Sequence, residues 1–163
     1  MKRKITNLLV GLLFLVGLGV LTYPTISNQW NTYRQSKLIS TYEAAMEPMT
    51  PEDFSEEWEK ARAFNASFTD NNLYGDVFGA EDTKLEDTEY WKVLNIAGDG
   101  VMGYLSIPKI NIKLAIYHGT GEDVLQTGVG HLNGTKFPIG GEGSHSVLAA
   151  HRGLPSARLF TDI

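Results

Sequence analysis

His151, at the end of a run of small residues, is the residue whose sequence context best suits a catalytic role. Residues 146–150 read Ser-Val-Leu-Ala-Ala, and Arg-Gly-Leu-Pro follows the histidine. Small apolar residues in this density predict a buried strand, and the glycine and proline predict a turn directly after it. An imidazole titrates near neutral pH, so a histidine at such a strand end can pass a proton to a bound substrate.

Two other chemistries are disfavoured. The four histidines, His118, His131, His145 and His151, follow no helical or zinc-ribbon ligand spacing, and the chain contains no cysteine. We therefore predict no metal and no cofactor, and expect the first three to be hydrogen-bonded residues in loops or at strand ends. Ser144 lies in Gly-Glu-Gly-Ser-His-Ser, which lacks the Gly-x-Ser-x-Gly spacing of a hydrolase nucleophile.

Short strands must position His151. Residues 101–107 and 110–117 alternate in polarity as half-buried strands do, with Pro108-Lys109 as a tight turn between them. A short helix is predicted within 119–126. Seventeen glycines, many placed between these runs, are typical of a β-barrel with tight corners. We count four or five strands between residues 90 and 163, which is too few to close a barrel.

Three segments of this region closely resemble the class C (pilin-assembling) sortases of Gram-positive surfaces. They are Gly-Tyr-Leu-Ser-Ile-Pro-Lys-Ile at 103–110, Leu-Ala-Ile-Tyr-His-Gly-Thr at 114–120 and Ala-His-Arg-Gly-Leu-Pro around His151. The resemblance implies a mainly β fold related to an eight-stranded barrel. We expect an incomplete sortase-like β-barrel, preceded by a transmembrane helix and an N-terminal helical and lid segment.

The resemblance also implies a chemistry. Class C sortases are cysteine transpeptidases that cleave LPxTG-like sorting signals and join pilin subunits by isopeptide bonds, and the histidine matched by His151 is catalytic. The family's arginine lies beyond its cysteine on a later strand, so Arg152 and Arg158 do not match it. Because this chain has no cysteine, we expect the truncated N-terminal portion of such an enzyme, inactive alone. The alternative is a non-catalytic, membrane-anchored relic.

The amino terminus predicts a membrane anchor over residues 1–27. Lys2-Arg3-Lys4 precedes residues 5–26, which are uncharged and mostly aliphatic. That length crosses a hydrocarbon core of about 30 Å, and the basic triplet favours an inside amino terminus. A cleaved signal peptide is the competing reading, but Thr-Tyr-Pro-Thr at 22–25 lacks the small-residue cleavage pattern. We expect a single-pass plasma-membrane protein whose main part is extracellular.

A helical segment is predicted over 28–70. Pro48 ends a first helix, and Thr50-Pro51 begins a second one as N-cap and first helical residue. A stripe of Phe54, Trp58, Ala61 and Phe68, with Phe64 or Asn65 between, is expected to be packing surface.

Residues 71–89 are predicted to form a polar connecting loop, and the resemblance to class C sortases suggests a more specific role for it. In class C sortases an Asp-Pro-aromatic motif covers the active site as a lid, and Asp76 and Phe78 match its acid and its ring. Val77 replaces the proline, so the match is incomplete. A plain surface loop is the alternative.

The distribution of charge along the chain argues against one class of binding partner, nucleic acids. Residues 43–89 hold fourteen acids against three bases, whereas residues 90–163 hold five against six. Without a basic patch interleaved with aromatics, nucleic-acid binding is not expected. The resemblance implies pilin or surface proteins with sorting signals as partners, besides the plasma membrane.

Overall fold

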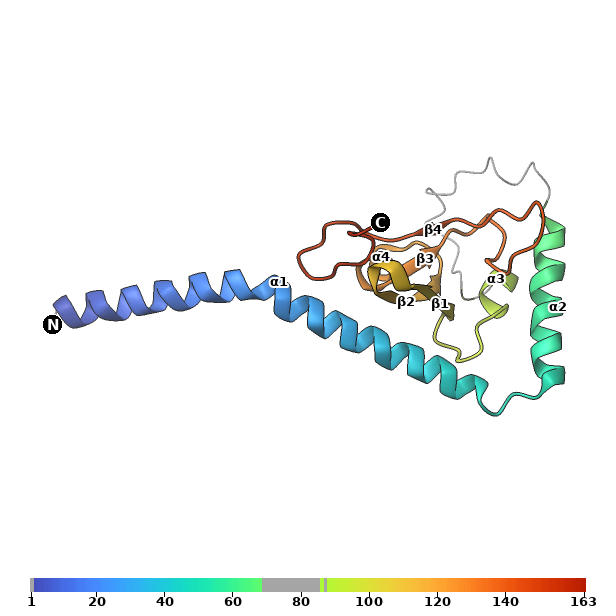
Figure 1. Ribbon diagram of the computed structural model, residues 1–163, viewed down its shortest axis with the longest axis horizontal. Helices are drawn as coiled ribbons and strands as arrows, with labels where there is room; N and C mark the ends of the chain where they lie inside the picture. Colours follow the sequence, from blue (N-terminus) through green and yellow to red (C-terminus); the bar gives the residue numbers. More distant parts are fainter. Residues whose placement is uncertain (1, 69–85, 87) are drawn as a thin grey trace.

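The computed structural model describes residues 2–68, 86 and 88–163. Helix α1 (Lys2–Met46) extends far beyond the rest of the chain, and its second half runs along a small sheet domain (Figure 1). Helix α2 (Pro51–Ser67) stands at the opposite end of that domain from the free half of α1.

Helix α1 is continuous across residues 27 and 28, where the sequence predicted a change from membrane anchor to helical segment. Its 45 residues span roughly 65 Å at 1.5 Å per residue. Pro24 lies inside it and cannot donate the usual backbone hydrogen bond, and Figure 1 shows a bend between the two halves. Among the described residues, α1 is the one helix long and apolar enough to cross a membrane.

The second half of α1 packs on the sheet through one face. Gln35, Ile39 and Tyr42 are buried at i, i+4 and i+7. The Tyr42 hydroxyl donates to the carbonyl of Met102 at 3.0 Å, and Gln35 Oε1 accepts from the backbone N–H of Ala115 at 2.8 Å. These bonds fix the helix to the first two strands of the sheet, β1 (Val101–Ile107) and β2 (Ile112–His118).

Helix α2 begins as predicted. Thr50 Oγ1 accepts from the N–H of Asp53 at 3.2 Å, and Asp53 Oδ2 accepts from the N–H of Thr50 at 2.9 Å, which completes a capping box. The predicted stripe packs only in its second half, where Ala61 and Asn65 are buried and Phe64 is partly buried against the core. Phe54 and Trp58 stay 37% and 43% exposed.

The sheet has four strands in the order β1-β2-β3-β4 and is open at both ends. Strand β2 pairs antiparallel with β1 and parallel with β3, which itself pairs antiparallel with β4. In chain order, the helices and strands of the sheet domain are α3 (Glu89–Lys92), β1 (Val101–Ile107), η3 (Pro108–Ile110), β2 (Ile112–His118), α4 (Glu122–Thr127), β3 (Val129–His131) and β4 (Leu148–Ala149). The open sheet and the long apolar helix confirm the predicted fold class. The strand expected over 146–150 is shorter, at two residues.

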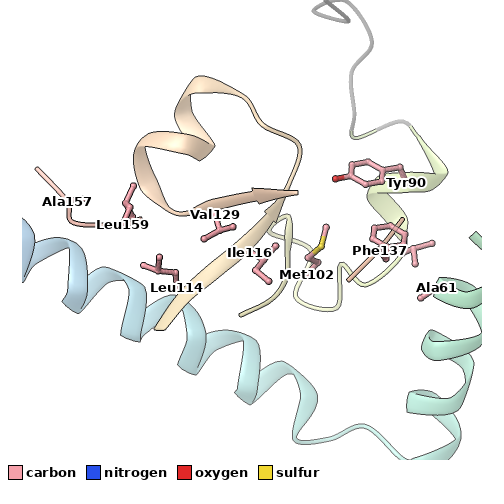
Figure 2. Close-up of a cluster of buried hydrophobic side chains, with 10 residues drawn as sticks. Ala61, Tyr90, Met102, Leu114, Ile116, Val129, Phe137, Ala157 and Leu159 are labelled. Carbon is pink, nitrogen blue, oxygen red and sulfur yellow. The ribbon is translucent and has the colours of Figure 1, made fainter. Parts of the chain in front are cut away.

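The core lies between the sheet, α2 and the segment 132–160 (Figure 2). Phe137 is fully buried at its centre, and its ring stacks on Tyr90 with centroids 5.4 Å apart. The other buried members are Ala61, Val93, Met102, Leu114, Ile116, Val129, Ala157 and Leu159. Residues far apart in the chain thus share one small core.

Candidate functional site

His151 lies two residues beyond β4, where the chain leaves the sheet. Its backbone carbonyl accepts a hydrogen bond from the N–H of Phe160 at 3.2 Å, so the segment 151–160 closes into a loop. The His151 side chain is 34% exposed. The imidazole therefore stands at the domain surface on a backbone tied down at both ends.

Glu122, the first residue of α4, approaches His151 from the neighbouring β2–β3 connection. Its Oε1 lies 3.5 Å from His151 Nε2, which is long for a hydrogen bond, and Nε2 has no closer hydrogen-bond partner among the described residues. Gln126 Nε2 donates to the same carboxylate oxygen at 2.8 Å. That bond, more than His151, lowers the pKa of Glu122. The carboxylate is thus held where it can orient the imidazole.

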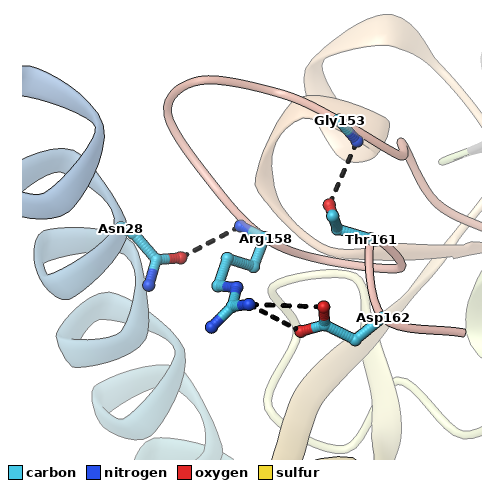
Figure 3. A network of polar contacts seen from close by, with 5 residues as sticks. All are labelled: Asn28, Gly153, Arg158, Thr161 and Asp162. Atoms are coloured by element: carbon cyan, nitrogen blue, oxygen red, sulfur yellow. Dashed lines mark hydrogen bonds and ion pairs between the residues drawn. The ribbon is translucent and has the colours of Figure 1, made fainter.

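The loop after His151 is fastened to α1 as well as to itself (Figure 3). Gly153, at φ 78°, donates its N–H to Thr161 Oγ1 at 3.1 Å. The guanidinium of Arg158 forms an ion pair with Asp162 at 3.2 Å. The backbone N–H of Arg158 donates to Asn28 Oδ1 at 3.0 Å. Arg158 is therefore occupied by a neighbouring acid.

His118 and His131 lie elsewhere, at the ends of β2 and β3 and around Tyr90. The Tyr90 hydroxyl lies 2.9 Å from His131 Nδ1 and accepts the N–H of Gly119 at 2.9 Å. The two ring nitrogens of His118 each lie 2.9 Å from a carbonyl, those of Gly100 and Val93. Both histidines are buried and hydrogen-bonded at strand ends.

Burial lowers the pKa of both His118 and His131, because an imidazolium loses its hydration there. The carbonyls beside each ring oppose this effect but are the smaller contribution. The structure therefore holds both rings neutral near pH 7 as packing elements of the core. The described residues gather no three His, Asp or Glu side chains that could hold a metal ion.

The structure brings together residues that the sequence did not connect. Glu122 was expected only as part of a short helix, and its approach to His151 crosses from one strand connection to another. Tyr90 was not singled out, although its hydroxyl joins β3 to the turn after β2. Asp76 and Phe78 lie outside the described residues.

Comparison with known proteins finds a similarity to sortases in the second half of the chain. The Sortase domain family matches residues 105–163. Sortase D of Bacillus subtilis (strain 168) is 46% identical over 50 residues, which are 31% of this chain and 24% of that protein.

Solved structures extend the similarity to most of the chain. Sortase C1 from Streptococcus agalactiae is 44% identical with a TM-score of 0.67, over 77% of this chain and 63% of that one. Sortase C-1 from Streptococcus pneumoniae is 41% identical with a TM-score of 0.64, again over 77% and 63%. The chain thus spans somewhat less than two thirds of the solved sortases that it matches.

Residues 105–163 are thus similar to a sortase domain, and most of the chain is similar to solved class C sortases. The chain itself has no cysteine.

Proposed function

We propose that this chain is the N-terminal portion of a membrane-anchored class C sortase, in which His151 is the catalytic histidine. The main support is the position of His151, two residues after β4 and inside the segment that matches the Sortase domain. Such an enzyme cleaves an LPxTG-like sorting signal and transfers the freed carboxyl end to a pilin amine.

In this proposal the reaction runs through an acyl enzyme. A cysteine thiolate attacks the threonyl carbonyl, and His151 donates a proton to the glycine amine that leaves. A pilin lysine amine then attacks the thioester carbonyl, which forms the isopeptide bond and releases the thiol. Glu122, whose Oε1 lies 3.5 Å from His151 Nε2, would hold the imidazole in position for this proton transfer.

The thiolate must come from outside these 163 residues, because they include no cysteine. A serine hydroxyl is a poor substitute, since its pKa lies far above the thiol value of about 8.5. We therefore expect the chain alone to give only background cleavage of a fluorogenic LPxTG-type peptide. Turnover by the chain alone that His151→Ala abolishes would contradict this.

A chimera tests the role of His151 directly. Residues 1–163 are joined to the segment of Streptococcus agalactiae sortase C1 that follows its matching part. We expect the chimera to cleave the peptide, and His151→Ala to lower kcat/KM by about 10²–10⁴, the usual contribution of a general acid.

His145→Ala is the matched control for this chimera. Its side chain is an exposed imidazole six residues before His151, and we expect kcat/KM to change little. Equal losses in the two variants would show that His151 has no special role. An inactive chimera with a folded domain would favour the second candidate, a non-catalytic membrane-anchored relic, which the absence of cysteine supports.

We propose a lid role for Asp76 and Phe78 from the family resemblance alone. An acid paired with the catalytic arginine and a ring over the sulfur would both shield the thiol. In the chimera, replacing both residues by alanine should raise the alkylation rate of the active-site cysteine. Equal rates would show that the segment 71–89 is only a connection.

A further inference from the structure

One apolar face of α1 continues from the end of the proposed membrane segment into the residues that follow it. Tyr23, Ile26, Trp30 and Tyr33 follow at i, i+3, i+7 and i+10, and they are 53%, 63%, 62% and 60% exposed. We call them the α1 stripe. The residues that α1 buries against the sheet, such as Gln35, lie on another face of the helix. The α1 stripe therefore points away from the domain.

Two of the three aromatic rings of the stripe contact each other and have little other protein around them. Trp30 and Tyr33 touch each other, with ring centroids 5.8 Å apart and both side chains largely exposed. In water this surface would remain unburied. Tryptophan and tyrosine next to an apolar span are the residues that membrane–water interfaces favour, since each ring has an apolar body and a polar edge.

We propose that the α1 stripe lies in the lipid headgroup layer on the outer side of the membrane. This inference rests on the proposed membrane anchor. At 1.5 Å per residue, Trp30 lies about 6 Å and Tyr33 about 10 Å beyond Ile26, the last residue of the apolar segment. The headgroup region is roughly 5–8 Å thick on each side, and the bend in α1 shortens the advance along the membrane normal (Figure 1).

The charge of this part of α1 suits anionic lipid. Between Ile5 and Tyr42 the only charged residues are Arg34 and Lys37, and both are exposed. The first acid of the helix is Glu43, a further six residues beyond Lys37. Basic side chains close to an anionic lipid surface are attracted to it.

The loop after His151 lies at the same level of the helix. Ser27 Oγ donates to the carbonyl of Ser156 at 3.1 Å, and Asn28 accepts from Arg158 (Figure 3). Ser27 and Asn28 directly follow the apolar segment, so their partners lie beside the headgroup layer too. The consequence is that the domain is held close against the membrane, with the segment that leaves His151 next to its surface.

Fluorescence quenching in vesicles tests this placement. The full chain is reconstituted in vesicles of phosphatidylcholine and phosphatidylglycerol with bromine either near the headgroup or near the acyl-chain end. We expect quenching by the shallow bromine and much weaker quenching by the deep one. Trp30→Phe should remove the quenching.

Trp58→Phe is the matched control, because Trp58 is a similarly exposed tryptophan on α2, and its loss should leave the quenching intact. A chain that floats with the vesicles but shows no quenching, or quenching that Trp30→Phe does not reduce, overturns the inference while the anchor stands. Such a result would favour a protein partner or a second copy on the α1 stripe. A chain that does not float with the vesicles overturns the anchor and this inference together, whereas the peptide assay of the chimera in detergent tests the sortase proposal separately.

Discussion

Buried imidazoles at the ends of β2 and β3 make the core sensitive to acid. His118 and His131 are 2% and 0% exposed, and burial lowers the pKa of each below its ordinary value. In the unfolded chain the same side chains titrate near 6.5. Below that pH the unfolded state therefore binds more protons than the folded one, and acid favours unfolding.

The expected outcome is a loss of stability as the pH falls from about 7.5 to about 5.5, because each buried histidine removes up to roughly 1.4 kcal/mol per pH unit in that window. Above the unfolded pKa the contribution is complete and the stability should level off. The measurement is urea unfolding of the full chain in micelles, followed by tryptophan fluorescence.

His145→Gln serves as the control for this titration, since its side chain is exposed and the fall in stability should persist. His131→Gln should make the pH dependence shallower. A wild-type chain whose unfolding midpoint is constant across the window would contradict the account of two rings held neutral by burial.

At the scale of elements, Gln35 joins α1 to two parts of the sheet domain. Its Oε1 accepts from Ala115 N–H at 2.8 Å, and its Nε2 donates to the Thr127 carbonyl at 2.5 Å. The side chain is 1% exposed. One buried amide thus connects α1 both to β2 and to the end of α4.

Gln35→Leu should destabilise the chain, because it leaves a buried N–H on β2 and a carbonyl at the end of α4 without partners. Each unsatisfied group costs about 1–3 kcal/mol. Thermal unfolding in micelles measures the loss. Ser36→Ala is the matched control, since that exposed hydroxyl bonds only the Thr32 carbonyl of the same helix. Similar melting temperatures for the two variants would show that Gln35 does not attach α1.

At the scale of the whole molecule, the continuous helix α1 links the amino terminus to the sheet domain. We expect the amino terminus inside and the residues beyond about 28 outside, because Lys2-Arg3-Lys4 favours the cytoplasmic side. A phosphatase fused after Ile163 should be active and a cytoplasmic reporter at the same point silent.

Charge neutralisation provides the control for this orientation. Replacing Lys2, Arg3 and Lys4 by glutamine removes the inside bias and should reduce phosphatase activity. An active cytoplasmic reporter on the unaltered chain would refute the orientation.

The sequence by itself determined the local elements, and its motifs carried the resemblance to class C sortases. Periodicity, helix caps and turn residues depend only on residues close together in the chain. The sequence therefore predicted β1, β2, the start of α2 at Thr50 and the apolar half of α1. His151 was singled out because a strand end and a motif coincide there. The open sheet followed from counting short strands.

Only the tertiary structure decided which distant residues meet. Glu122 beside His151, Tyr90 beside His131 and Asn28 beside Arg158 join positions between 29 and 130 residues apart, and no pattern of neighbours encodes such pairs. The tertiary structure also decided that α1 is one continuous helix. The end of the apolar segment predicted a boundary between residues 27 and 28, but packing of one face of the second half on the sheet keeps a single helix. Local propensity sets the elements, and burial against partners far along the chain sets their limits and contacts.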